Sequence, residues 1–178
     1  MDNHTDRIPP VQPTIGDVRP TSKHNYAGQG TGCNDLLEHI RQVCKRLTQI
    51  AGELILRGVD HDQSKFSSEE YTSFVNQTAK LKDLVYGSDE YREALKKIRP
   101  AIDHHYKHNR HHPKHFPNGI QGMNLIDITE MFCDWHAATL RQKDGNVRTG
   151  IEIDQKRFGF SDDLKQIFFN TADFLEGS

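Results

Sequence analysis

Apolar residues recur every three or four positions between residues 34 and 58, and this spacing constrains the fold more than any other feature of the chain. The apolar positions of the stretch are Leu36, Ile40, Val43, Leu47, Ile50 and Leu54. This period is that of an α-helix with one apolar face. Asn34 is a suitable N-cap and Gly58 a suitable end, so the sequence predicts an amphipathic helix between them.

Further helices are indicated by capping residues and by a proline. Ser67 and Glu70 have the spacing of a capping box that opens a helix over residues 68–85. Ser88 begins another helical stretch, which Pro100 should kink or divide because proline lacks a backbone donor and crowds the preceding turn.

The C-terminal half continues this pattern. Asn124 can cap a helix that runs to Gly145, and a last helix covers 161–175 with acidic residues in its first turn. Residues 151–160 are interpreted as a short extended piece. Alternating strand patterns are nearly absent, so the predicted fold class is all-α, a bundle of about five or six helices.

The N-terminal segment differs in composition from the rest of the chain. It holds four of the seven prolines and almost no apolar periodicity, so it cannot bury enough surface to offset the entropy of ordering. Residues 1–32 are therefore predicted to be a flexible tail, and residues 33–178 a single helical domain.

Composition excludes several classes of protein. A net charge of -2 gives no strong signal for nucleic-acid binding. No apolar run is long enough to span a membrane, and the N-terminus lacks the apolar core of a signal peptide. Three cysteines without a CxxC pair are unlike a secreted disulfide framework. We therefore expect a soluble, cytoplasmic protein; the sequence does not indicate its oligomeric state.

The dipeptide His61-Asp62, with Lys65 shortly after it, is the most informative chemical motif. His39 precedes it, six histidines follow within residues 104–115, and Asp134 comes later on a predicted helix. Imidazole nitrogen together with carboxylate oxygen suits Mn, Fe, Co, Ni or Mg better than a thiolate-type zinc site. The sequence therefore predicts a site for a divalent metal.

Two features of this pattern leave alternatives open. Asp127, Glu130 and Asp134 share one face of their predicted helix, so Asp127 is the alternative ligand if Asp134 lies elsewhere. The histidine-rich run could also chelate metal at the surface without catalysis, since its helical spacing alone permits binding.

In motif order the chain resembles the HD-domain metal-dependent phosphohydrolases, particularly the branch of the HD-GYP phosphodiesterases. The resemblance covers roughly residues 34–145 and rests on His61-Asp62, on Lys65, on the paired histidines of HHPKHFPNGIQG and on Asp134 in DWHAAT. The glycine-tyrosine-proline signature is absent. A kinship with small proteins of bacteriophages and bacteria is also indicated by RGVDHDQSKF and HHPKHF.

The resemblance implies an HD-domain-like helical bundle that binds one or two divalent ions. It implies a first metal position made of His39, His61, Asp62 and Asp134. It also implies that His104 or His105, with His111 and His112, either completes a second metal position or binds and protonates the substrate.

The activity implied is phosphoester hydrolysis by a metal-activated water. Lys65 and Arg141 would stabilise negative charge on the phosphoryl group. The expected substrate is a nucleotide or related small phosphoester. The alternatives are a cyclic nucleotide or dinucleotide phosphodiesterase, and a non-catalytic, metal-stabilised helical module that binds a ligand or protein, for example as a phage accessory factor.

Overall fold

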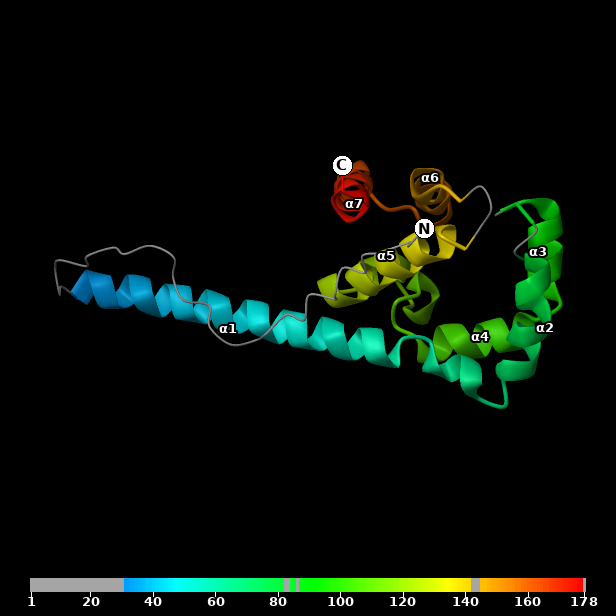
Figure 1. Ribbon diagram of the computed structural model, residues 1–178, viewed down its shortest axis with the longest axis horizontal. Coiled ribbons are helices and arrows are strands. Elements are labelled where there is room, and N and C mark those ends of the chain that lie inside the picture. Colours follow the sequence, from blue (N-terminus) through cyan, green and yellow to red (C-terminus); the bar gives the residue numbers. More distant parts are fainter. Residues whose placement is uncertain (1–30, 82–83, 86, 142–144, 178) are drawn as a thin grey trace, which may run out of the picture. The chain divides into compact units, whose positions relative to one another are not determined.

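The computed structural model describes residues 31–81, 84–85, 87–141 and 145–177, and these form seven α-helices, three short 3-10 helices and no strand (Figure 1). The α-helices are α1 (Thr31–Asp60), α2 (Tyr71–Leu81), α3 (Asp89–Lys96), α4 (Arg99–His108), α5 (Leu125–Thr139), α6 (Val147–Phe158) and α7 (Asp162–Glu176). The 3-10 helices are η1 (Gln63–Phe66), η2 (Pro113–His115) and η3 (Gly119–Gly122). The all-helical prediction is confirmed, with more helices than expected.

The chain divides into two compact units, Met1–Val43 and Cys44–Ser178. The described part of the first unit belongs to α1, and all other described elements lie in the second. The predicted flexible tail falls outside the described residues except for Thr31 and Gly32, which are the first residues of α1.

Helix α1 is longer at both ends than predicted. It begins at Thr31, before Asn34, and continues through Gly58 to Asp60. A glycine inside a helix lowers helix stability by only about 1 kcal/mol relative to alanine. It ends the helix only where the backbone turns left-handed. Asp62 makes that turn here, with φ 58° and ψ 16°.

The apolar stripe of α1 does not face a core within the part of the chain that the structure describes. Leu36, Ile40 and Leu47 each expose more than 60% of their surface. The helical period was therefore predicted correctly, whereas burial of the stripe is not observed. No described helix is both long enough and apolar enough to cross a membrane.

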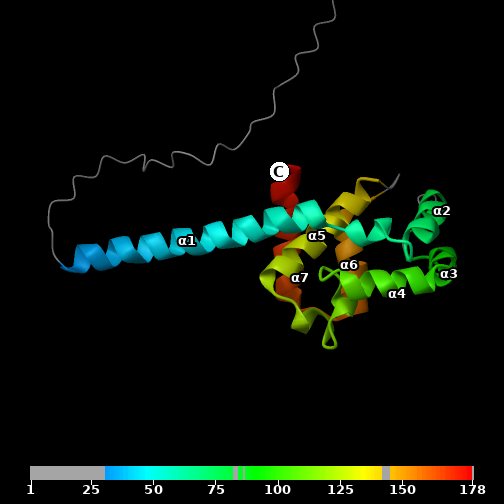
Figure 2. The same ribbon diagram turned by 90° about the horizontal axis from the view of Figure 1, so that it is seen from below.

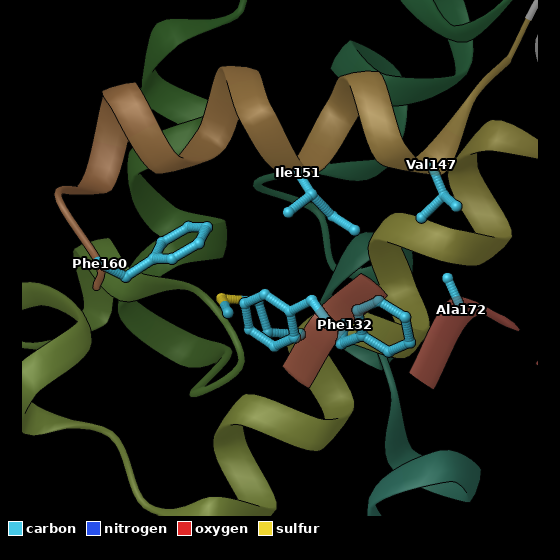
Figure 3. Packing of buried hydrophobic residues seen from close by; sticks show 7 residues of the cluster. Phe132, Val147, Ile151, Phe160 and Ala172 are labelled. Carbon is cyan, nitrogen blue, oxygen red and sulfur yellow. The ribbon is translucent and has the colours of Figure 1, made fainter. Parts of the chain in front are cut away.

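The hydrophobic core lies between α5, α6 and α7 (Figure 3). Its buried members are Met131, Phe132, Val147, Ile151, Phe160, Phe168 and Ala172. The Phe132 and Phe168 rings stack with centroids 5.3 Å apart, and Phe160 meets Phe168 edge-on at 5.4 Å. Each large apolar side chain buried in this way stabilises the fold by about 1.5–3 kcal/mol. The core therefore fixes α5, which also carries site residues.

The break between α3 and α4 follows the sequence prediction. Ser88 caps α3 by accepting a hydrogen bond from the Tyr91 N–H, and α3 ends before Pro100, which lies in the first turn of α4. Figure 2 shows α3 and α4 as separate helices that meet at this junction. The proline therefore divides the predicted helix and sets where α4 starts.

The predicted capping box at Ser67 and Glu70 is wrong, although a helix does follow. Ser67 Oγ is buried and has no hydrogen-bond partner among the described residues. The Glu70 carboxylate turns away from the helix start and lies 2.7 Å from His104 Nδ1 and 2.9 Å from His105 Nδ1. The Glu70 carboxylate therefore pairs with two imidazole groups and not with the one backbone N–H that it would accept from in a capping box.

The predicted extended piece at residues 151–160 is also wrong, because α6 covers most of it. Val147, Ile151 and Asp154 are buried. Their spacing of four and three residues is helical, and it outweighs the short alternation in IEID. The last predicted helix is confirmed as α7, with Asp162 and Asp163 in its first turn, and Ser161 caps it by accepting from the Leu164 N–H.

Candidate metal centre

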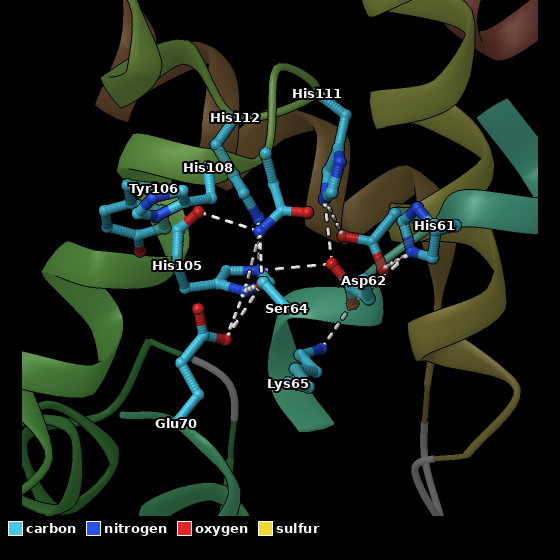
Figure 4. Close-up of polar contacts among 12 residues, drawn as sticks. His61, Asp62, Ser64, Lys65, Glu70, His105, Tyr106, His108, His111 and His112 are labelled. Carbon is cyan, nitrogen blue, oxygen red and sulfur yellow. Dashed lines mark hydrogen bonds and ion pairs between the residues drawn. The ribbon is translucent and has the colours of Figure 1, made fainter. Parts of the chain in front are cut away.

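The His61-Asp62 pair lies at the sharp turn between α1 and η1. Asp62 is the only described non-glycine residue with positive φ, a conformation that aspartate tolerates better than most residues. The Lys65 N–H donates a hydrogen bond to the Asp62 carbonyl at 2.9 Å, which closes the turn. Both side chains then point toward α4, α5 and the loop after α4 (Figure 4).

Four imidazoles and two carboxylates meet at this point. His105 comes from α4, His111 and His112 from the loop before η2, and Asp134 from α5. Their ligand atoms form two groups in which all atoms lie within 4.8 Å of one another. The first group is Asp62, His105, His111 and His112, and the second is His61, His111 and Asp134.

Asp62 is central to the first group. Its Oδ1 lies 3.2 Å from His105 Nε2 and 3.4 Å from His111 Nε2, while His112 Nε2 lies 2.9 Å from His105 Nε2. In the second group His61 Nε2 is 3.6 Å from Asp134 Oδ1. In the first group the ε nitrogens of His105 and His111 thus approach the same carboxylate oxygen, and the ε nitrogen of His112 approaches that of His105.

The opposite ring nitrogens are held by two glutamates, Glu70, which is buried, and Glu130, whose side chain is 10% exposed. Glu130 Oε1 lies 2.9 Å from His61 Nδ1 and 3.0 Å from His111 Nδ1, and Glu70 Oε2 lies 2.9 Å from His105 Nδ1. An ionised carboxylate can only accept, so each of these Nδ1 atoms donates to its glutamate, and with a metal bound each Nε2 would present its lone pair to the ion. Metal-binding histidines are typically oriented by carboxylates in this way.

Two atoms at the centre of the cluster have no hydrogen-bond partner among the described residues. They are Asp62 Oδ1 and His111 Nε2, both buried. A buried polar atom without a partner costs free energy. A divalent cation would satisfy both atoms, and the nitrogen and oxygen donors fit Mn, Fe, Co, Ni or Mg.

The cluster is strongly coupled electrostatically. The nearby carboxylates of Asp134 and Glu130 raise the pKa of His61 to about 10. Burial raises the pKa of Asp62, but His105 and Lys65 outweigh it and hold that pKa well below its usual range. Burial and the neighbouring His111 lower the pKa of His112 to about 2, so this ring is neutral.

A pH effect on stability follows for the metal-free protein. The raised pKa of His61 means that its protonated form stabilises the fold fully below pH 6.5, its unfolded value, and that this contribution is lost as pH rises toward 10. We expect the melting temperature in EDTA to fall between pH 6.5 and 8.5. His61→Gln should abolish that slope; an unchanged slope in the variant would assign it to another group.

The outer glutamates were not identified as site residues from the sequence. Glu130 was placed on the face shared with Asp134, but its role was not predicted, and Glu70 was interpreted as a capping residue. Arg57 Nε lies 3.0 Å from Glu130 Oε2 and also pairs with Asp127. The helical face of α5 is the available signal for Glu130; nothing local marks the role of Glu70, whose imidazole partners lie on α4 and which also accepts from the Ser64 hydroxyl.

Replacing Glu130 by glutamine should lower metal affinity by about 10- to 100-fold, the usual effect of losing an orienting carboxylate. The amide is similar in shape but no longer accepts from both His61 and His111 at Oε1 as an anion. Metal titration with a competing chelator measures the effect. Glu152→Gln, at an exposed position on α6, is the control; equal affinities in the two variants would refute an orienting role.

Other predicted site residues lie outside the two ligand groups. His39 is exposed on α1 in the first unit and belongs to neither group, so its role as a ligand stays a prediction. His104 pairs with Glu70 on the outer side of the cluster. Asp127, the alternative to Asp134, pairs with Arg57 and Arg110 and accepts from the Asn124 N–H in the α5 capping box.

Lys65 and Arg141 lie at the wall of a cavity of about 520 Å³ that opens beside the cluster. Lys65 Nζ pairs with Asp62 Oδ2, and it lies 5.5 Å from the centroid of the Phe74 ring. His105 and Asp134 also line the cavity. A molecule in this space would therefore lie directly against potential metal ligands.

Together the fold and the cluster define an all-helical protein with a histidine- and aspartate-rich candidate metal site. The chain belongs to the family described as "Family of unknown function (DUF5662)", which it matches over residues 29–174. That range includes every ligand of both groups. Comparison with curated proteins and with solved structures gave no match.

Proposed function

We propose that the protein is a metal-dependent phosphohydrolase that acts on a nucleotide or related small phosphoester through a metal-activated water. One observation supports this most: imidazole ε nitrogens and carboxylate oxygens converge at the wall of a cavity, while Glu70 and Glu130 hold the opposite ring nitrogens. A surface chelator would not need such orientation, nor a cavity beside it.

The metal-holding residues in this proposal are those of the two ligand groups: His61, Asp62, His105, His111, His112 and Asp134. His111 belongs to both groups, so it could contribute to either of two metal positions. A divalent ion bound there supplies a Lewis acid and a water of lowered pKa. For His105 the sequence leaves open a metal position or a role in binding and protonating the substrate, and we propose the metal position because its Nε2 belongs to the first ligand group.

Lys65 is the residue proposed to bind the phosphoryl group. Its ammonium lies between Asp62 and the cavity, so a small rotation of its flexible stem suffices to reach a phosphate bound beside the cluster. Arg141 lines the same cavity and is exposed, which places a second cation at the opening. Both would stabilise negative charge that develops during hydrolysis.

The free state of all three cysteines supports a reducing compartment for this activity. Cys33, Cys44 and Cys133 form no disulfide, as is usual for cytoplasmic proteins. We therefore place the proposed enzyme in the cytoplasm.

A substrate panel tests the proposal. Purified protein is incubated with Mn, Fe, Co, Ni or Mg and with phosphomonoesters, nucleotides and cyclic nucleotides or dinucleotides, and phosphate or nucleotide products are measured. We expect turnover of monoesters with at least one metal. Turnover of cyclic substrates alone would instead indicate a phosphodiesterase. No turnover with any metal, in protein that still binds an ion, would leave a non-catalytic metal-stabilised module.

A further inference from the structure

We propose that the cavity beside the cluster binds the organic part of the substrate, that this part is a flat ring with polar edges, as in a nucleoside, and that Gly150 determines whether it fits. The inference rests on the proposed function for the phosphate end of the ligand. To the proposed function it adds a second binding region in the same unit of the chain, and it names Gly150 as the residue that sets the size of that region.

The cavity is far larger than a phosphate group requires. Its volume of about 520 Å³ lies within the range of about 300–1,000 Å³ that is typical of small-molecule sites. Lys65, His105 and Asp134 form its wall at the cluster, and the rest of the lining comes from α2, α3, α4, α5 and α6. A phosphoester whose phosphate lies at the cluster would therefore direct its organic group into this space.

The lining indicates the chemistry of that group. Four aromatic side chains, Phe74, Tyr91, Tyr106 and Trp135, contribute to it. Flat rings stack on such side chains with a gain of about 0.5–1.5 kcal/mol beyond area burial. The wall also includes the polar side chains of Asn146, Thr149, Asp154 and Arg157. Asp154 already pairs with Arg157, and Asn146 accepts from the Thr149 N–H; the edge groups of a heterocycle can add hydrogen bonds to this polar wall, whereas an alkyl chain cannot.

Gly150 keeps part of this space open. It lines the cavity at the fourth residue of α6, and a Cβ built there meets nothing within 4 Å. A glycine inside a helix costs about 0.8–1 kcal/mol of helix stability, so a larger residue should not harm folding here. It would instead place its side chain in the cavity. The fold tolerates the substitution, but a bound ring would not.

Binding can be measured without hydrolysis, because Trp135 is the only tryptophan of the chain and lines the cavity. Adenosine, which has no phosphoester bond, is titrated into the metal-loaded protein while tryptophan fluorescence is recorded. We expect a saturable change with adenosine, none with ribose, and an affinity at least about tenfold lower in Gly150→Leu, since its side chain takes up ring space.

The matched control is Gly52→Leu, another glycine inside a helix whose added Cβ meets nothing within 4 Å and which does not line the cavity. It should bind adenosine like wild type, and both variants should melt no lower than wild type. Equal adenosine affinity in Gly150→Leu and Gly52→Leu would overturn the inference, as would saturable binding of octyl phosphate without binding of adenosine.

Turnover separates this inference from the proposed function. If adenosine binds and Gly150→Leu weakens it, but no phosphoester is hydrolysed, the ring site stands and the enzyme proposal fails. If adenosine monophosphate and ribose 5-phosphate are both hydrolysed, at rates that Gly150→Leu leaves unchanged, the enzyme proposal stands and the ring site fails.

Discussion

Asp62→Asn is expected to abolish metal binding and to remove the thermal stabilisation that added metal gives. Asp62 Oδ1 is the oxygen that His105 and His111 approach, and an amide is a much poorer ligand for a divalent ion than a carboxylate. Saturation at a hundredfold excess over Kd stabilises the folded state by about 2.7 kcal/mol, so the loss should be clear in melting curves recorded with and without metal.

Asparagine is chosen because Asp62 has positive φ, a backbone conformation that asparagine also tolerates and alanine does not. Loss of metal can therefore be assigned to the missing charge. Asp60→Asn, at an exposed position two residues earlier, is the control and should bind metal like wild type. Full metal occupancy in Asp62→Asn would show that the ligand assignment is wrong.

Lys65→Met is expected to leave metal content unchanged and to lower kcat/KM by about 100- to 1,000-fold, the usual effect of losing one preorganised electrostatic donor. Methionine retains the apolar character of the lysine stem and removes only the ammonium, which lies over the Phe74 ring, and Asp62 keeps His105 and His111 as neighbours. The measurement is metal analysis combined with steady-state kinetics on the best substrate of the panel.

Lys107→Met, which removes an exposed lysine of α4, should have no effect on either quantity. Loss of metal together with activity in Lys65→Met would mean that the ion pair with Asp62 supports the metal site and that Lys65 has no separate role. Unchanged kcat/KM would exclude Lys65 from phosphate binding.

Local signals in the sequence are sufficient for the starts of α3, α4 and α5. Ser88 and Asn124 cap α3 and α5, and Pro100 separates α3 from α4. These features act within one helical turn, so no knowledge of tertiary contacts is needed. The same holds for the face of α5 that carries Glu130 and Asp134, because helical periodicity alone places them together.

Contacts between distant residues could not be derived in this way. Glu70 matched a capping box, but its carboxylate meets His105, 35 residues away in sequence. The order of motifs predicts His39 as the first ligand, and that role stays a prediction, whereas the ligand groups of the described residues include His105 and His111, which lie far from His61 in the sequence. Six histidines lie close together in the sequence, and only the turn after α4 decides which imidazoles point inward.

The most direct test of a metal centre is an anomalous-scattering map of crystals grown with Mn²⁺, combined with metal analysis of the protein in solution. We predict a peak within about 2–2.5 Å of Asp62 Oδ1 and of ε nitrogens among His105, His111 and His112, with any second peak beside His61 and Asp134. No peak in this cluster, or a peak confined to the stacked His104 and His108 pair, would contradict the account.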